Sequence, residues 1–244
     1  WLDYCRRKSA KNIVVLAPTG VAALNVHGQT VHRFFGFPVN ISVEKITSKD
    51  FVPRAKRIYK KLETLIIDEV SMLRADILDC IDAFLQLYGP REDVPFGGVQ
   101  MVFVGDLYQL PPVLSRHEEP FFRQKYSTPY FFSADVFRAI SLKVVELNKI
   151  YRQKDERFIG LLNRIRSNTV TGEDIKLLNS RVIGTEVVAD KDDFRISLTT
   201  VNQLADEINR KRMEALDGQL YSSQAVVDGN FGADYYPTSE VLEF

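Results

Sequence analysis

Two short apolar runs in this chain each end in a carboxylate. Residues 64–69 read TLIIDE, and residues 99–106 read VQMVFVGD. A short apolar run without regular polar alternation predicts a strand that is buried on both faces, as in a parallel sheet covered by helices. Because ligands of such sheets bind just beyond the carboxyl ends of the strands, we expect Asp68, Glu69 and Asp106 to face a substrate.

Adjacent acidic side chains at a strand end suit the hydrolysis of a nucleoside triphosphate. Asp68 would hold Mg²⁺ on the phosphates of a nucleotide, and Glu69 would orient and deprotonate the attacking water. The sequence contains no Gly-x-x-x-x-Gly-Lys-Ser/Thr loop, the motif that cradles phosphates in such enzymes. We therefore expect half of a nucleotide site here, within a piece of a longer protein that carries the other half.

The charge balance bears on possible partners. The 32 basic residues balance the 32 acidic residues, so the overall charge does not indicate a nucleic-acid partner. Such a partner would have to be held by local basic patches, of which residues 54–61 (RAKRIYKK) form the densest. A solvated helix face has the same composition, and that interpretation stays open.

Cysteine and histidine usage argues against a disulfide-rich or metal-binding protein. The 2 cysteines and 3 scattered histidines provide neither a disulfide framework nor metal-ligand spacing, and Cys80 falls at a core-facing helical position. No apolar run approaches the roughly 20 residues of a membrane span. We expect a soluble intracellular protein, located in the bacterial cytoplasm or in the nucleus or mitochondrion of a eukaryote.

Strand-like and helix-like segments alternate along the chain, which predicts an α/β architecture with a mostly parallel sheet. Besides the two runs above, residues 12–17, 142–147 and 195–199 have the composition of strands. Apolar positions between 77 and 85 recur at helical spacing, and Gly89 and Pro90 are expected to end that helix. A change of pattern near Asn148 predicts the boundary between two domains.

Two further side chains complete a candidate hydrolytic site. Gln109 lies in the loop after the second run, where a neutral amide would hydrogen-bond the γ-phosphate or the attacking water. Arg152 lies just past the predicted domain boundary, where a guanidinium reaching from a second domain would neutralise charge that develops in the transition state. The alternatives are an exposed loop residue for Gln109 and a surface charge for Arg152.

Hydroxyls and aromatic rings gather after the first strand-like run. Hydroxyls and helix N-termini suit backbone phosphates, and aromatic rings stack on unpaired bases. The candidate DNA-binding residues of this region are Pro18, Thr19, Gly20, Thr30, His32 and Phe34. In the alternative interpretation, Phe34 and Phe35 belong to the core and His32 fills a hydrogen-bonding pocket; we expect at least one of the two phenylalanines to be core.

Read in order, these segments resemble the PIF-family DNA helicases, relatives of RecD in the 5′-to-3′ branch of helicase superfamily one. LAPTGVAA (16–23) and TVHRFFG (30–36) resemble the family's first DNA-contacting motifs. IIDEVSML (66–73) resembles its Walker B motif.

Later segments continue the resemblance in the same order. FGG (96–98) and GDLYQLPPV (105–113) are similar to motif III, and LNKIYRQ (147–153) to motif IV, whose arginine is the family's finger. LTTVN (198–202) and ADEIN (205–209) are similar to a second-domain segment near the DNA track, which adds Thr200 and Asn202 to the candidate DNA contacts.

The resemblance implies a motor of two RecA-like P-loop NTPase domains that hydrolyses ATP with Mg²⁺, walks on single-stranded DNA and unwinds forked DNA. Residues 1–147 would form the first domain, lacking only the P-loop strand, and residues 148–244 the start of the second. Residues 36–60 would correspond to a small wedge subdomain. The family favours a monomeric motor, whereas the residues themselves leave the oligomeric state open.

Two other functions compete with a helicase segment. One is a catalytically inactive relative that binds nucleic acid or a protein without hydrolysis; the presence together of Asp68, Glu69, Gln109 and Arg152 speaks against such decay. The other is an unrelated P-loop enzyme such as a kinase or a signalling GTPase, in which the segments similar to motifs III and IV would have no purpose.

Overall fold

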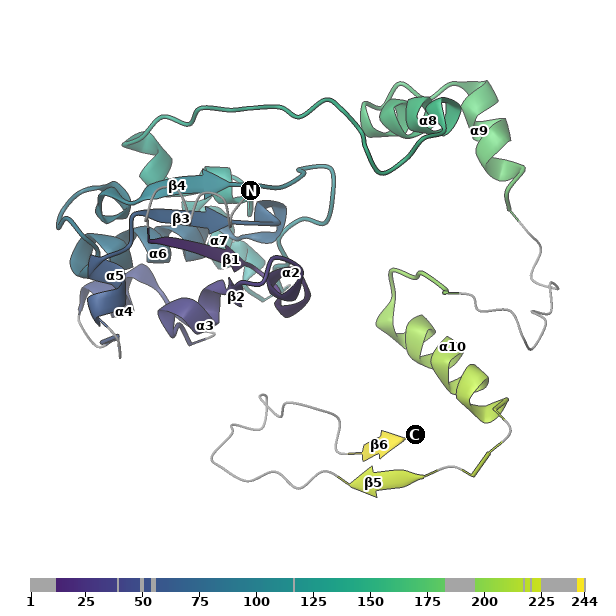
Figure 1. Ribbon diagram of the computed structural model, residues 1–244, viewed down its shortest axis with the longest axis horizontal. Helices are drawn as coiled ribbons and strands as arrows, with labels where there is room; N and C mark the ends of the chain where they lie inside the picture. The colour runs from purple at the N-terminus through teal and green to yellow at the C-terminus, as the bar shows by residue number, and fades with distance from the viewer. Residues whose placement is uncertain are drawn as a thin grey trace. The chain divides into compact units, whose positions relative to one another are not determined.

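The computed structural model describes residues 12–38, 40–48, 51–53, 56–115, 117–182, 196–216, 218–219, 221–224 and 241–243 (Figure 1). The chain divides into two compact units, Trp1–Thr171 and Gly172–Phe244. The candidate ATP-site residues all belong to the first unit. The boundary between two motor domains that the sequence indicates near Asn148 stays a prediction.

A four-stranded, all-parallel sheet forms the centre of the first unit. Its strands are β1 (Ile13–Ala17), β2 (Gln29–Thr30), β3 (Thr64–Ile67) and β4 (Gln100–Phe103), and their order is β2-β1-β3-β4. All four residues of β3 are buried, as expected for a strand covered on both faces. The predicted α/β class and parallel sheet are confirmed.

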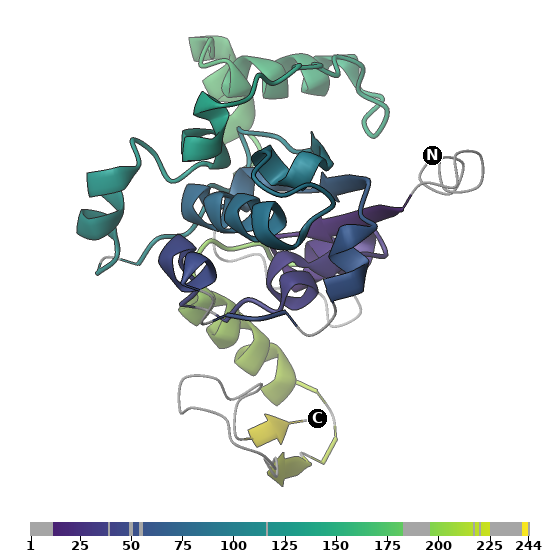
Figure 2. The ribbon, with the colours of Figure 1, turned by 90° about the vertical axis from the view of Figure 1, so that its left-hand side faces the viewer.

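Short helices flank the sheet and one long helix dominates its packing. The 14-residue α6 (Ala75–Tyr88) contributes fully buried side chains such as Leu78, Ile81 and Phe84 to the main core, and it ends at Gly89 as predicted. Figure 2 shows this unit from the side. Cys80 on α6 is buried, which raises the pKa of its thiol to about 12 and confirms its predicted core-facing position. The other helices and turns of this unit are α2 (Gly20–Asn25), α3 (Val31–Phe35), α4 (Val43–Thr47), α5 (Lys56–Lys60), η1 (Val70–Met72), η2 (Pro95–Gly98), α7 (Glu119–Lys125), η3 (Phe131–Ser133), η4 (Asp135–Arg138) and α8 (Glu156–Arg166).

The segment between α3 and β3 packs into the main core. Phe37, Ile46 and Tyr59 are each at most 6% exposed, and Phe37 and Tyr59 both contact the ring of Phe84 edge-on. Through these three side chains the segment shares the hydrophobic core of the sheet. Their role as a wedge stays a prediction.

The described residues of the strands expected at 142–147 and 195–199 do not form strands; Arg195 lies outside the described residues. Residues 142–147 and 196–199 have no regular secondary structure, and Leu147 and Leu198 are 87% and 95% exposed. β-forming composition makes a strand only where a neighbour pairs its backbone groups, and no described residue pairs with either segment.

The second unit contains α9 (Gly172–Asn179), α10 (Asn202–Glu214) and an antiparallel pair, β5 (Ser222–Gln224) with β6 (Val241–Glu243). Among the described residues, no helix of either unit is long and apolar enough to cross a membrane.

Candidate nucleotide and nucleic-acid site

The strand register brings most of the candidate residues to one edge of the sheet. Ala17 pairs with Thr30, Leu16 with Ile67, and Ile67 with Phe103, so the carboxyl ends of the four strands lie side by side. Thr30 is the last residue of β2, and the segments that leave this edge carry Pro18 and Thr19 after β1, Asp68 and Glu69 after β3, and Asp106 and Gln109 after β4. The acidic positions thus follow β3 and β4, and the hydroxyl-bearing positions lie at the ends of β1 and β2.

Asp68 and Glu69 leave the sheet in a sharp turn. The Asp68 nitrogen donates to the Leu16 carbonyl at 2.8 Å, which extends the ladder by one bond, and Glu69 then adopts the left-handed conformation, with φ 50° and ψ 41°. That conformation costs a non-glycine residue about 1–2 kcal/mol, and strain of this kind gathers at functional sites. Both side chains are half-buried and form no hydrogen bond or ion pair with another described residue, so their oxygens are available to a ligand.

The loop after β4 lies close to the Glu69 turn. The Val70 nitrogen donates to the Val104 carbonyl at 3.0 Å, and the Val104 nitrogen donates to the Ile67 carbonyl at 2.9 Å. Beside this contact lies Ser71, whose Oγ is the one buried side-chain polar atom without a hydrogen-bond partner in the described part of the chain. The turn that carries Glu69 and the loop that carries Gln109 are therefore joined through their backbones.

Asp106 organises the loop that presents Gln109. Its carboxylate accepts hydrogen bonds from the Tyr108 nitrogen at 3.0 Å and from Gln109 Nε2 at 3.3 Å, while the Gln109 nitrogen donates to the Asp106 carbonyl at 3.1 Å. Gln109 is exposed on this turn. The strand-end position of Asp106 suggested a residue facing a substrate, whereas its carboxylate holds the side chain three residues later. An aspartate at the start of a tight turn is the feature of the sequence that could have predicted this restraint of Gln109 by Asp106.

The carboxylates fit a cation that is shared with phosphates. Mg²⁺ is commonly held by one or two carboxylates together with phosphate oxygens, and Asp68 offers such a free carboxylate at the strand end. No cluster of three or more His, Cys, Asp or Glu side chains suited to a metal occurs among the described residues. The donor set therefore fits Mg²⁺ bound with a nucleotide better than a cation caged by protein alone.

Arg152 is not brought to the carboxylates by any described contact. It lies exposed in the extended segment before α8 and forms no hydrogen bond or ion pair with another described residue. Its role as a finger stays a prediction.

Thr19 and Thr30 both cap helices. Thr19 Oγ1 accepts from the Ala22 nitrogen at 3.3 Å at the start of α2, and Thr30 Oγ1 accepts from the Arg33 nitrogen at 3.2 Å at the start of α3. Gly20 is exposed as the first residue of α2, next to the half-buried Pro18. These hydroxyls fix the local backbone, and an incoming phosphate would have to share them.

A cavity of about 810 Å³ opens beside α3 and is lined by Thr30, His32, Arg33 and Phe34 together with residues of the 51–59 region. Phe34 is half-buried, and its carbonyl accepts from the Tyr59 hydroxyl at 2.8 Å. Phe35 is 1% exposed within the aromatic core, which confirms that one of the two phenylalanines is core. Burial lowers the pKa of His32, and the nearby Arg74 lowers it further, against the opposing effect of Asp76.

Thr200 and Asn202, the remaining DNA-contact candidates, are exposed at the start of α10 in the second unit. The Val201 nitrogen between them donates to Thr199 Oγ1 at 3.2 Å, which forms a tight turn into the helix. Their contact with DNA stays a prediction.

The parallel sheet carries a carboxylate pair at the end of β3 and an amide-bearing loop after β4, which is the layout expected of the predicted RecA-like motor domain. The model of the PIF1-like helicase family matches residues 3–175. The chain belongs to the PIF1-like helicase family.

Its relatives include two curated ATP-dependent DNA helicases. The chain is 30% identical over 230 residues to RRM3 of Saccharomyces cerevisiae, covering 88% of this chain and 29% of that protein. It is 33% identical over 215 residues to PIF7 of Trypanosoma brucei brucei, covering 84% of this chain and 21% of that protein. The chain thus spans less than a third of the length of these relatives.

Solved Pif1 structures share the fold. Bacteroides sp Pif1 in complex with ADP-AlF4 matches with a TM-score of 0.78 and 36% identity, over 99% of this chain and 56% of that one. Pif1 helicase from Candida albicans matches with a TM-score of 0.81 and 26% identity, over 100% of this chain and 55% of that one.

Proposed function

We propose that this chain is the part of an ATP-dependent DNA helicase that supplies the hydrolytic residues of the ATP site and one wall of the DNA track. The observation that carries the proposal is the common edge of the sheet, where Asp68 and Glu69 follow β3 and Gln109 lies in the loop after β4. The same edge carries the hydroxyls and aromatic ring of the α2 and α3 region. ATP and DNA would therefore both bind at the carboxyl ends of these strands.

In the ATP half, each residue has a separate task. Asp68 holds Mg²⁺, which when bound neutralises phosphate charge. Glu69 orients the attacking water and takes its proton, while Gln109, held by Asp106, hydrogen-bonds the water or the γ-phosphate. Arg152, which the predicted boundary near Asn148 assigns to the second motor domain, would neutralise charge in the transition state, and this would couple hydrolysis to domain closure.

In the DNA half, the cavity beside α3 receives a single strand. Its aromatic wall offers Phe34 to an unpaired base, and Arg33 and the helix caps lie where backbone phosphates would pass. Thr200 and Asn202 would contact the same strand from the second motor domain. Bacteroides Pif1 has been crystallised bound to ssDNA, and Pif1 helicases have been studied structurally on forked dsDNA, which supports single-stranded and forked DNA as the substrates here.

Glu69→Gln in a full-length protein containing this chain tests the assignment. The variant should bind Mg-ATP and single-stranded DNA normally but lose ATP turnover by at least ~100-fold, because the amide cannot accept the proton. Glu92→Gln is the control, since Glu92 is exposed and pairs with Lys60 at 3.2 Å. Hydrolysis at the normal rate in the Glu69 variant would remove Glu69 from this role, whereas a wild-type protein without ATP turnover would favour a module that only binds.

Calorimetry of the chain by itself tests whether these residues form only part of the ATP site. We expect no tight binding of Mg-ATP, because a Gly-x-x-x-x-Gly-Lys-Ser/Thr loop is not among these residues. Tight binding would contradict the proposed division of the site.

A further inference from the structure

The loop that carries Gln109 is long and largely exposed, yet it is tied down at both ends. Residues 104–115 contain no helix or strand, and Tyr108, Leu110 and Val113 are each at least 67% exposed. The first anchor is the backbone contact of Val104 with Val70, next to Glu69. A loop of this length without further restraint would sample many positions for its side chains.

The second anchor is built on Glu118. Its Oε2 accepts from the nitrogen and the hydroxyl of Ser115, at 3.1 and 2.7 Å, and the Glu118 nitrogen donates back to the Ser115 hydroxyl at 3.3 Å. Its Oε1 accepts from Arg74 Nη1 at 2.9 Å. These hydrogen bonds and the charge of Arg74 lower the pKa of Glu118 to about 2, so this anchor is ionised at neutral pH.

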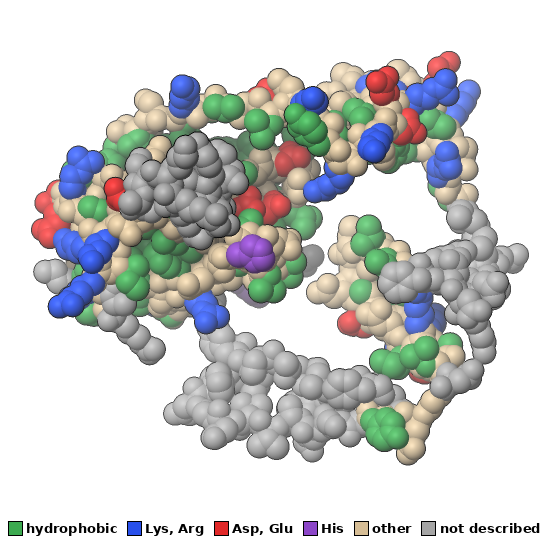
Figure 3. All heavy atoms as spheres, viewed as in Figure 1, with side chains coloured by type: hydrophobic (Ala, Val, Ile, Leu, Met, Phe, Trp, Pro, Cys, Tyr) green, Lys and Arg blue, Asp and Glu red, His purple; other side chains and the backbone are tan. Residues whose placement is uncertain are grey.

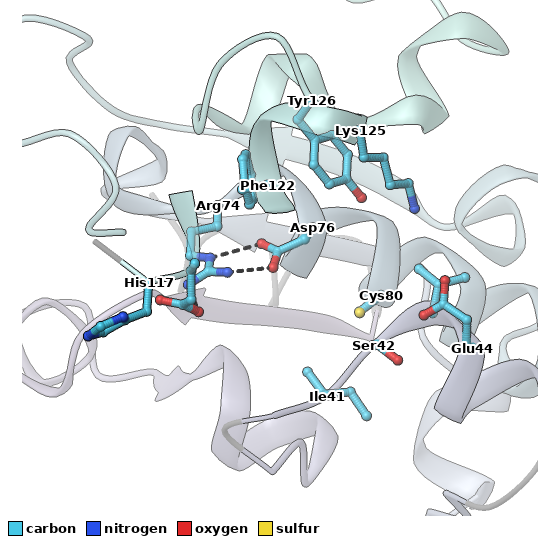
Figure 4. Close-up of a pocket in the computed structure, with 12 residues that line it drawn as sticks. Ile41, Ser42, Glu44, Arg74, Asp76, Cys80, His117, Phe122, Lys125 and Tyr126 are labelled. Atoms are coloured by element: carbon cyan, nitrogen blue, oxygen red, sulfur yellow. Dashed lines mark hydrogen bonds and ion pairs between the residues drawn. The ribbon is translucent and has the colours of Figure 1, made fainter. Parts of the chain in front are cut away.

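Arg74 is itself held from three sides. Its Nε and Nη2 donate to the two oxygens of Asp76 at 3.0 and 2.7 Å, and its guanidinium lies 5.5 Å from the centre of the Phe122 ring (Figure 4). It also forms a backbone bridge with Tyr130. A guanidinium fixed in this way presents its remaining donor to Glu118 in a set direction.

Arg74 also stands only five residues after Glu69, at the start of α6. A series of contacts therefore joins the Glu69 turn to the Gln109 loop at a second place. It runs from Glu69 through the η1 turn to Arg74, across to Glu118 and Ser115, and back along the loop to Gln109. We propose that Arg74 is a positioning residue for ATP hydrolysis, which acts through Glu118 to hold the Gln109 loop in register with the Glu69 turn. The inference rests on the proposed function, in which Glu69 and Gln109 act on the same water.

The test uses the full-length protein with Arg74→Met, Glu118→Gln and the double variant. Glu118→Gln leaves the Arg74–Asp76 pair in place and is the variant least able to disturb folding. The control is Arg123→Met, which breaks a 2.7 Å side-chain ion pair with Glu119 on the adjacent α7. The Glu119 nitrogen donates to the Ser115 carbonyl at 3.2 Å, and this backbone hydrogen bond does not involve the side chain that the control removes. Amide hydrogen exchange of residues 104–115 and of α6 is measured together with kcat and KM for DNA-stimulated ATP hydrolysis.

We expect exchange in residues 104–115 to rise at least ~5-fold in both single variants while α6 stays protected. The kcat should fall about 10-fold with KM for ATP within about twofold, since misplacement affects the reacting geometry rather than binding. The double variant should be no worse than the more severe single variant, because both changes break one link. Arg123→Met should resemble the wild type.

Three outcomes would overturn the inference. They are unchanged exchange in residues 104–115, a normal kcat with a loosened loop, and equal loosening of α6, which would make Arg74 a residue of general stability. Gln109→Ala separates this from the proposed function: normal hydrolysis by that variant would reject the role of Gln109, whereas exchange in the Arg74 and Glu118 variants still reports on the anchor itself.

Discussion

The backbone of Gly105 lies against that of Val70, so closely that a methyl group at position 105 would come within 3.0 Å of the Val70 nitrogen and 3.1 Å of Val70 Cγ1. This contact sits where β3 and β4 end, between the turn that carries Glu69 and the loop that carries Gln109. Spacing between the two proposed catalytic segments thus depends on the absence of a side chain at one position.

Gly105→Ala should therefore disturb both stability and turnover. Overpacking against a fixed backbone costs about 1–3 kcal/mol, and we expect the free energy of unfolding to fall by that amount. Urea titration measures it, alongside the rate of ATP hydrolysis in the full-length protein. Gly172→Ala is the control, because no atom lies within 4 Å of a methyl group there. Equal stability of the two variants would show that the loop shifts without cost.

Glu69→Gly should stabilise the fold while removing activity. Glycine adopts the left-handed conformation of this residue without a Cβ penalty, so we expect a gain of about 0.5–1 kcal/mol after the added backbone entropy of the unfolded chain. Glu69→Gln keeps the penalty and should leave stability unchanged. Chemical denaturation of both variants gives the comparison, and a less stable glycine variant would argue that the Glu69 side chain contributes packing.

Tyr126→Phe should destabilise the first unit by about 1–3 kcal/mol. The Tyr126 hydroxyl donates to the buried Asp79 carboxylate at 2.8 Å, and that carboxylate also accepts from the nitrogens of Asp135 and Val136, both at 3.1 Å. Loss of one donor leaves a buried charge less satisfied. Tyr221→Phe, at a tyrosine 64% exposed, is the matched control. Thermal unfolding of the two variants checks the difference, and a neutral Tyr126→Phe would indicate that water replaces the hydroxyl.

Arg152→Ala in the full-length protein should slow ATP hydrolysis by about 10³-fold or more and leave single-stranded DNA binding intact, as expected for an arginine finger. Single-turnover hydrolysis and fluorescence anisotropy measure the two effects separately. Arg123→Ala controls for loss of an exposed positive charge. A rate within a few-fold of the wild type would make Arg152 a surface charge.

Glu118 should make stability depend on acid pH. Its folded pKa of about 2 lies below the ordinary value of 4.5, so the unfolded chain binds the proton more readily and stability is lost as the pH falls from 4.5 towards 2. Because the Glu118 side chain is 48% exposed, we expect less than about 1 kcal/mol. The stability difference between wild type and Glu118→Gln should therefore shrink between pH 6 and pH 3. A difference independent of pH would contradict the ionised anchor.

Local patterns in the sequence were sufficient to predict the sheet and the positions of its strand-end carboxylates. The continuous apolar character of residues 64–67 predicts a strand buried on both faces, and β3 is such a strand because helices and neighbouring strands surround it. The helical spacing of apolar residues after Glu69 predicts α6, with Gly89 at its end. The placement of candidate residues at strand ends followed from the same pattern, since parallel strands share a carboxyl edge.

Other features depend on residues far apart in the chain. Composition did not distinguish Phe34 from Phe35, and burial beside Phe84 decided which of them is core. Distant partners also explain why the described parts of 142–147 and 195–199 do not form the expected strands. Their backbone groups find no pairing neighbour among the described residues. Periodicity describes one segment at a time and carries no information on its partners.

The sequence by itself determined that this chain builds a parallel α/β sheet in which two strands, β3 and β4, are followed by carboxylates, because burial pattern and strand-end chemistry are local properties. Only the tertiary structure decided that Asp106 restrains Gln109, and that Arg74 reaches Glu118 across 44 positions of the chain. Ion pairs and hydrogen bonds of this kind form where packing brings two surfaces together, and no spacing rule within one segment specifies which surfaces meet.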